Sequence, residues 1–404
     1  MLFVLVSEES RGIWVYLITP SSFLGVENMR QFRGVSEKEI RQFFHIPPSD
    51  FSKNLERKKL GMAMGAALYL PGSMPNFTDK LSKNNLKNLT SAIICLEDAV
   101  SDSELLEAEL NVVNELKLIE QNDQNSLIDI NNIPLLFIRI RTVQHLEKVA
   151  TLLGSAIQYI TGFVFPKCTS YNAKSFFLCL ESINLQYSTH LYGLPILETK
   201  EIIYTETREQ ELSKLYTVFK QFEDLVLTIR VGATDFTSLF SQRRPGNRTI
   251  YELLLITNCF TDILNKFNRK EDNFIVSGPV YEYFETLDSF RLFTDVNSIE
   301  SILWNEVQLD LLNGFYGKTC IHPSQIDIVN SGYIVPKELF EDACLIIENK
   351  AETNGVLRSS AKNKMNEVKP HYSWAMKIIA QAEIYGVLKE NVTSLDFLQY
   401  IKNL

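Results

Sequence analysis

Two apolar runs decide the fold: HLYGLPILETKEIIY (190–204) and DLVLTIRVGATDFTSLF (224–240). The apolar part of the first run ends at Glu198, and that of the second ends close to Asp235. A buried strand that stops at an acid and is followed by a helical pattern is typical of an α/β barrel, which presents functional side chains at the C-terminal ends of its strands. Because one strand–helix unit separates the two acids, we expect them to share one divalent cation.

Outward from these runs, short apolar segments alternate with amphipathic stretches. The stretches 103–120 and 143–160 place apolar residues at helical spacing. Eight strands alternating with helices predict a (β/α)8 TIM barrel. An open doubly wound sheet is the alternative, but no GxGxxG motif follows the first predicted strand. The predicted strands are residues 66–72, 91–98, 134–140, 162–167, 191–198, 225–232, 273–280 and 317–323.

The barrel domain is predicted over residues 61–335, with an addition at each end of the chain. Residues 1–60 contain the β-prone runs LFVLVS and IWVYLI, which predict a hairpin, and then a helix that Ser36 caps. Residues 336–404 predict a helical C-terminal extension. Its charged stretch 353–371 is too polar for a core, so we expect a mobile appendage, a lid or an oligomer arm.

The composition restricts the partners and the location. The chain has 404 residues, a net charge of −9 and 45% hydrophobic residues, which gives no reason to expect nucleic acid or an anionic membrane surface as a partner. Six widely spaced cysteines without a CxxC pair predict reduced thiols in a cytoplasmic protein. No apolar run predicts a signal peptide or a membrane span.

Charged side chains recur at the predicted strand ends. One such residue is more often a solvated rim residue, but a set from six strands indicates a functional face. Oxygen ligands without cysteine or clustered histidine favour Mg²⁺ or Mn²⁺ over zinc. The alternative is that Glu198 and Asp235 form salt bridges with basic neighbours and bind no metal. The set is Glu97, Asp98, Arg139, Lys167, Glu198, Asp235 and His322.

Seven short motifs carry a family resemblance. Their order resembles that of the citrate lyase β-subunit superfamily of metal-dependent C–C lyases, which includes malyl-coenzyme A lyases and 2-oxo-acid aldolases. Three longer pieces, RRPGNRTIYE (243–252), SGPVYEYF (277–284) and NEVKPHYSWA (366–375), are similar to a divergent branch associated with tellurium-resistance gene clusters. The seven motifs are LYLPGSMPN (68–76), LEDAVSDSELLEAE (96–109), FIRI (137–140), VFPK (164–167), ILET (196–199), GATDFTSLF (232–240) and CIHPSQI (320–326).

The resemblance implies a lyase or aldolase that cleaves or forms a C–C bond next to a 2-oxo acid through a metal-stabilised enolate. By the same resemblance, Glu198 and Asp235 bind Mg²⁺, and Arg139 binds the oxo acid. Glu97 and Asp98 order metal-bound water. The partner is then a small anionic substrate, either a 2-oxo acid or an acyl thioester, and we expect a homo-oligomer.

Basic residues elsewhere add candidates for substrate binding. Lys167 is predicted to bind carboxylate together with Arg139. Arg243, Arg244 and Arg248 of the RRPGNR loop would hold a phosphate or a second carboxylate. The alternative for these three arginines is a solvated basic loop.

The sequence offers two candidates for the general base. Lyases of this superfamily bring an acid from the C-terminal segment of a neighbouring subunit over the barrel mouth, and here that segment offers Glu367 and His371. Histidine has a pKa suited to proton transfer near neutrality. The alternative is that both residues only pack the extension.

The sequence leaves two further questions undecided: whether the protein uses coenzyme A, and which class of reaction it catalyses. Cys95 and Arg141 differ from the residues common among relatives, and no motif marks an adenine or pantetheine site. Two other functions remain as alternatives: a metal-dependent phosphate-linked transferase or lyase of a biosynthetic pathway, and a non-catalytic assembly component that retains the barrel.

Overall fold

The structure is a computed structural model of the chain. It describes residues 29–82, 86–128, 133–272, 274–285, 295–349, 356–359 and 364–403. The hairpin predicted near the N-terminus falls in residues 1–28, outside these ranges. Within the described ranges, no helix combines the length and the apolar character needed to cross a membrane.

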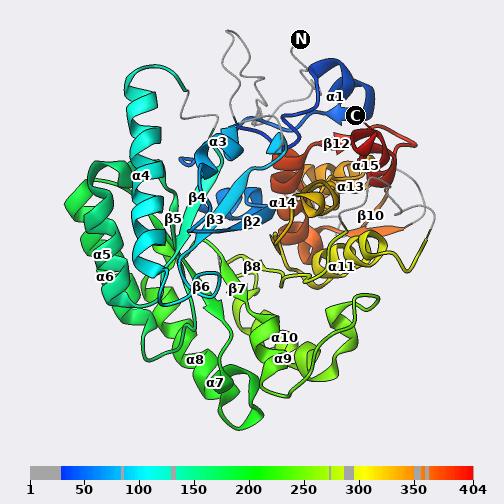
Figure 1. Cartoon of the computed structure of the whole chain (residues 1–404). Coiled ribbons are helices and arrows are strands. Elements are labelled where there is room, and N and C mark those ends of the chain that lie inside the picture. Colours follow the sequence, from blue (N-terminus) through cyan, green and yellow to red (C-terminus); the bar gives the residue numbers. More distant parts are fainter. Residues whose placement is uncertain are drawn as a thin grey trace.

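Eight parallel strands form a barrel, and each lies within a predicted strand segment (Figure 1). The strands are hydrogen-bonded in the order β8-β7-β6-β5-β4-β3-β2-β9. A bridge between Gly278 and Lys318 joins the two ends of this sheet, so the predicted (β/α)8 barrel is confirmed. The strands are β2 (Ala66–Pro71), β3 (Ser91–Cys95), β4 (Leu135–Arg139), β5 (Gly162–Phe165), β6 (Tyr192–Leu197), β7 (Ile229–Val231), β8 (Val276–Ser277) and β9 (Lys318–Cys320).

Most of the strands are apolar because both of their faces are covered; Arg230 in β7 and Lys318 in β9 are charged exceptions. Every residue of β3, β4 and β6 is buried, between the barrel interior and the surrounding helices. Local caps fix where helices begin: Thr142 accepts a hydrogen bond from the backbone of His145 at the start of α5. The surrounding helices are α3 (Phe77–Ser82), α4 (Leu105–Gln124), α5 (Val143–Leu153), α6 (Ala173–Tyr187), α7 (Lys200–Ile203), α8 (Thr205–Gln221), α9 (Ala233–Ser238), α10 (Leu254–Phe267), α11 (Ile299–Asn313) and α12 (Ile326–Ser331).

The two ends of the chain meet beside the barrel. Helix α1 (Glu37–Phe43) begins after Ser36, which forms the predicted cap. The next strand, β1 (Phe44–Ile46), pairs antiparallel with β12 (Val387–Leu388) of the extension. In Figure 1 the red α15 (Ser394–Lys402) accordingly lies next to the blue α1.

The C-terminal extension packs on the barrel through helices. The predicted helices are present as α13 (Lys337–Glu348) and α14 (Val368–Tyr385), with a short hairpin of β10 (Val356–Arg358) and β11 (Met365–Glu367) between them. Tyr385 donates a hydrogen bond of 2.8 Å to the carbonyl of Met62. The helices of the extension therefore pack on the barrel, whereas parts of the polar stretch 353–371, on which the expectation of a mobile appendage rested, fall outside the described residues. The domain limits, and a role as lid or oligomer arm, remain predictions.

Helix α14 covers the end of the barrel where the strands begin. It contacts α2 (Arg57–Ala63), which leads into β2. Lys377 donates to Asn268, which precedes β8, and Gln381 donates to the carbonyl of Tyr333. The opposite end, where the strands finish, is left to the loops that carry the predicted site.

Phe397 of α15 provides a test of how far this extension stabilises the fold. Its ring lies 4.9 Å from that of Phe32 and 5.0 Å from that of Phe44, measured between centroids. We expect Phe397→Ala to lower the free energy of unfolding by about 3–5 kcal/mol, because it removes a buried ring and leaves a cavity. Urea unfolding measures this. Leu185→Ala is the control, since that side chain is 82% exposed; equal effects of the two substitutions would contradict the prediction.

Candidate active site

The carboxylates of Glu198 and Asp235 converge on one small space beside Gly232. Glu198 follows β6, and Asp235 lies in the first turn of α9, after β7. A Cβ atom on Gly232 would lie 2.5 Å from Oε2 of Glu198 and 3.4 Å from Oδ2 of Asp235. Both acids therefore border a position that any side chain other than glycine would fill.

Burial makes this pair of acids unfavourable when both are charged. Glu198 is 4% exposed. Burial raises its pKa to about 8; the Arg139 charge opposes the rise and Asp235 adds to it. The pKa of Asp235 is raised by burial and by Asp98, against the opposing charges of Arg139 and Lys167. A cation between the two carboxylates would remove their mutual repulsion.

The backbone of Lys167 fixes one oxygen of Glu198. Its N–H donates a hydrogen bond of 2.7 Å to Oε1 of Glu198. Lys167 has φ of 47°, in the left-handed region that non-glycine residues rarely adopt. This conformation directs the N–H at Glu198 from the end of β5, and such strained residues concentrate at functional sites.

Arg139 links three acids from two strand ends. Its Nη2 lies 2.6 Å from Oε2 of Glu97, 2.8 Å from Oδ2 of Asp98 and 3.4 Å from Oε1 of Glu198. Its Nε is buried and has no hydrogen-bond partner within the described ranges. The guanidinium is therefore held in place on one side and keeps a donor for another group.

The site has an excess of negative charge. Lys167 pairs with Glu97 and lies 3.4 Å from Asp98. Burial and the neighbouring Asp98 raise the pKa of Glu97, although Arg139 and Lys167 oppose the rise. The pKa of Asp98 is lowered despite its burial, because Glu97, Arg139 and Lys167 all favour its charged form. Four carboxylates (Glu97, Asp98, Glu198, Asp235) and two basic groups (Arg139, Lys167) leave a formal charge of −2.

These features fit a hard divalent cation. Among the described residues, no group of three or more His, Cys, Asp or Glu side chains is placed to hold a metal, so the candidate centre is the carboxylate pair itself. Mg²⁺ commonly takes only one or two carboxylates and keeps water in its other positions. The donor set and the excess negative charge match that chemistry.

A cleft of about 430 Å³ opens next to Glu97 and Asp98 and is lined also by Val100, Ser101, Asp102 and Arg141. Arg141 shapes this cleft, since it donates to the carbonyls of Leu96 and Val100 at 2.8 and 2.7 Å and pairs with Asp102. The cleft gives a substrate room beyond the acids.

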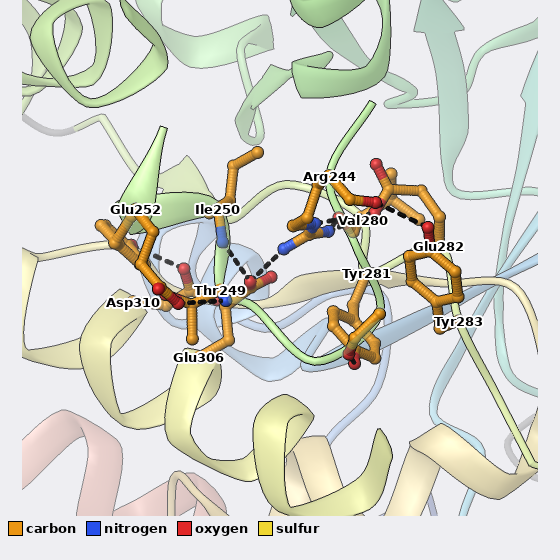
Figure 2. A network of polar contacts seen from close by, with 12 residues as sticks. Arg244, Thr249, Ile250, Glu252, Val280, Tyr281, Glu282, Tyr283, Glu306 and Asp310 are labelled. Atoms are coloured by element: carbon orange, nitrogen blue, oxygen red, sulfur yellow. Dashed lines mark hydrogen bonds and ion pairs between the residues drawn. The ribbon is translucent and has the colours of Figure 1, made fainter. Parts of the chain in front are cut away.

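Arg244, predicted to bind substrate, is instead part of a buried network of charges (Figure 2). It is 2% exposed. Its guanidinium pairs with Glu282 and Glu306 and donates to the carbonyl of Val280 at 2.9 Å. Because its donors are directed at these groups, the structure gives Arg244 a structural role. Arg243 is exposed, and its predicted role remains a prediction.

The network around Arg244 joins the loop after β7 to the last two strands. Lys318 of β9 pairs with Glu306 at 2.9 Å and with Asp310 at 2.7 Å. At the other end, Thr234 donates to Glu282 at 3.2 Å. Thr234 precedes Asp235, so the network fixes the segment that carries one of the two converging acids.

Glu367 and His371 lie away from the site in the same chain. Both are at the start of α14, where the Glu367 N–H donates to Nδ1 of His371 at 3.2 Å. The later turns of α14 cover the end of the barrel where strands begin, as the contact of Lys377 with Asn268 indicates. Within the described residues neither side chain contacts Glu198 or Asp235, and their role as base remains a prediction.

Sequence reasoning missed Arg230 of β7. Its side chain is 3% exposed and lies inside the barrel, where it donates to Thr319. The available signal was a single charged residue within the apolar run LVLTIRVG (225–232). Such a residue in a strand buried on both faces requires a partner or a function.

Fold and site together define a TIM-barrel enzyme whose acidic and basic residues gather at the C-terminal ends of the strands. Residues 58–387 match the family of C–C bond lyases of the TIM-barrel fold. The chain belongs to this family, and the predicted carbon–carbon lyase is confirmed.

Solved structures with a similar fold include a CitE protein and a malate synthase. CitE from Mycobacterium tuberculosis, in complex with magnesium, acetoacetate and coenzyme A, is 15% identical; the match covers 80% of this chain and 99% of that chain, with a TM-score of 0.52. Malate synthase from Haloferax volcanii, in a magnesium and glyoxylate complex, is 12% identical over 78% and 88% of the two chains, with a TM-score of 0.51. At these identities the likeness concerns the fold. No curated protein sequence matches the chain.

The pKa of Glu198 makes the stability of the metal-free protein depend on pH. The pKa of this carboxyl rises to about 8 on folding. Between the unfolded-state pKa and about pH 8, the folded protein therefore binds more protons than the unfolded protein, and its stability falls as pH rises through this window. We expect Glu198→Gln to remove this dependence. Thermal unfolding in EDTA at several pH values measures it, and the advantage of the variant should grow with pH and level off above about pH 8. A constant difference would contradict the assignment.

The buried network predicts different effects for two adjacent arginines. Arg244→Met leaves Glu306 buried without its partner and should lower the free energy of unfolding by about 3–5 kcal/mol. Arg243→Met, at an exposed position, is the matched control and should change it by less than about 0.5 kcal/mol. Urea unfolding measures both, and similar values for the two variants would refute the structural role of Arg244.

Proposed function

We propose that the protein is a Mg²⁺-dependent lyase or aldolase that cleaves or forms a C–C bond next to a 2-oxo acid through an enolate. The observation that carries the proposal is the convergence of Glu198 and Asp235 beside Gly232. The presence of magnesium in the complexes of CitE and malate synthase supports it. Mn²⁺ suits the same oxygen ligands.

Glu198 and Asp235 are the proposed ligands of the metal. When bound, Mg²⁺ acts as a Lewis acid that polarises the substrate carbonyl and favours the negative charge that develops on C–C cleavage. Arg139, whose Nη2 lies 3.4 Å from Oε1 of Glu198, binds the carboxylate of the substrate beside the metal. The three residues together orient the scissile bond.

Glu97, Asp98 and Lys167 position the residues that touch the substrate. Glu97 contacts both Arg139 and Lys167 and so fixes the distance between two positive charges. The lowered pKa of Asp98 keeps this acid ionised. Both acids can also accept hydrogen bonds from water on the metal, and Lys167 adds a positive charge toward an anionic substrate.

The alternative functions have less support from the site. A phosphate-linked transferase relied on the RRPGNR arginines, but Arg244 is held by buried acids and Arg248 pairs with Glu252 at 3.1 Å. A non-catalytic assembly component would have no need for Glu198 and Asp235 to face one another. The strained backbone of Lys167 at the same point also favours a catalytic site.

Proton transfer and the acyl carrier complete the proposal. Glu367 or His371 would act as the base only from a neighbouring subunit, which requires the predicted homo-oligomer. A mixture of inactive Asp235→Asn and His371→Ala chains would then regain activity. The cleft beside Arg141 is the proposed space for the remainder of the substrate, including a coenzyme A thioester if one is used.

Deuterium exchange tests the enolate chemistry without knowledge of the full substrate. In D₂O, the protein with Mg²⁺ should catalyse exchange of the methyl protons of pyruvate, followed by proton NMR, because reversible enolisation of a bound 2-oxo acid exposes these protons. Asp235→Asn and Arg139→Met should each slow exchange by about 100-fold or more.

Lys270→Met is the control for these substitutions, since it removes a surface charge outside the site. It should exchange pyruvate at the rate of the wild type. Exchange that proceeds equally in EDTA, or that survives Asp235→Asn, would refute the proposed function.

A further inference from the structure

Arg230 spans the interior of the barrel. It belongs to β7, yet it donates to Thr319 of β9 and its guanidinium lies 5.8 Å from the ring centre of Tyr69 on β2. Neither strand is a neighbour of β7 in the sheet. A side chain that reaches both must cross the lumen.

The same face of β7 leads to the converging acids. Residues two apart in a strand share a face, so Arg230 shares its face with Gly232, beside which Glu198 lies. Burial raises the pKa of Tyr69, and the charges of Arg230 and Arg139 oppose that rise. The phenol of Tyr69 is therefore within electrostatic reach of both arginines, and Arg230 lies one layer beneath the candidate metal centre.

Arg230 is a buried positive charge without an acidic partner. It is 3% exposed, and across the described ranges no carboxylate forms an ion pair with it; its polar contact there is the hydroxyl of Thr319. Arg244, buried to a similar degree, is bound by two acids. A buried guanidinium with no counter-ion lowers stability unless an anion is supplied from outside.

We propose that Arg230, with Tyr69 and Thr319, binds a second oxyanion group of the substrate. The substrate of this lyase therefore carries a carboxylate or phosphoryl group in addition to the carboxylate held by Arg139. The identity of the substrate as a 2-oxo acid rests on the proposed function, but anion binding by Arg230 does not.

The charges of the site agree with this assignment. Arg230 reduces the formal charge of the six groups described above from −2 to −1, and Mg²⁺ would bring it to +1. A substrate with two anionic groups then meets a site of opposite charge. Thr319 and Tyr69 offer hydroxyl groups that can donate to the same oxyanion.

The first test is the sign of the stability change. In EDTA and without ligand, Arg230→Gln should melt at the same temperature as the wild type or higher, because it removes an uncompensated buried charge. A clear loss of stability in Arg230→Gln would indicate a structural role and overturn the proposal. Arg244→Gln is the matched control, since that buried arginine has acidic partners and its loss should lower the melting temperature.

The second test is selective stabilisation by dianions. In EDTA, malonate, succinate or glutarate should raise the melting temperature of the wild type more than acetate, propionate or butyrate does, and Arg230→Gln should lose the difference. Arg230→Lys should retain part of it. Glycolate 2-phosphate in place of malonate distinguishes a phosphoryl from a carboxylate group.

Calorimetry with Mg²⁺ then separates the proposal from the proposed function. 2-Oxoglutarate should bind the wild type about tenfold or more tightly than 2-oxopentanoate, which has a methyl in place of the second carboxylate, and Arg230→Gln should bind both alike. If dianions stabilise only through Arg230 but no 2-oxo acid binds with Mg²⁺, the proposed function fails and this inference stands. If the wild type does not prefer dianions, or if Arg230→Gln keeps the preference, the inference fails.

Discussion

The site depends on the close approach of two acids across a glycine. Strands β6 and β7 are neighbours, and their ends bring Glu198 and Asp235 to a position that a Cβ atom on Gly232 would occupy. Burial raises the pKa of both carboxyls; the charge of Asp235 adds to the rise for Glu198, and that of Asp98 adds to it for Asp235. Without a cation, the two buried carboxylates lower the stability of the folded protein. Metal binding would remove this destabilisation.

Other parts of the structure hold this arrangement in place. Helix α14 covers the end of the barrel where strands begin, and the pairing of β1 with β12 ties the extension to the N-terminal addition. On the side of β8 and β9, the network of Arg244, Glu306 and Lys318 is fully paired and reaches Asp235 through Thr234. The paired buried charges of this network thus hold the segment that carries Asp235, one of the two converging acids.

The sequence predicted the barrel and the main acids because both depend on local patterns. The eight strands lie in mostly apolar segments, and Glu198 and Asp235 follow two of them. The partners of Arg244 could not be predicted, because Glu306 lies 62 residues further along the chain and the pair forms only after the barrel closes. The position of α14 likewise follows from tertiary packing, which separates Glu367 and His371 from the acids of their own chain.

Glu198 and Asp235 are proposed to form a magnesium site next to Gly232. Isothermal titration of Mg²⁺ into the wild type and into Gly232→Ala tests this site. Gly232 has φ of −94°, which alanine can adopt, but an alanine Cβ would lie 2.5 Å from both Cβ and Oε2 of Glu198 and so would displace this ligand. We expect one Mg²⁺ per chain in the wild type and binding at least about tenfold weaker, a loss of about 1.4 kcal/mol, in the folded variant. Equal affinity in the two proteins, or no Mg²⁺ binding by the wild type, would contradict it.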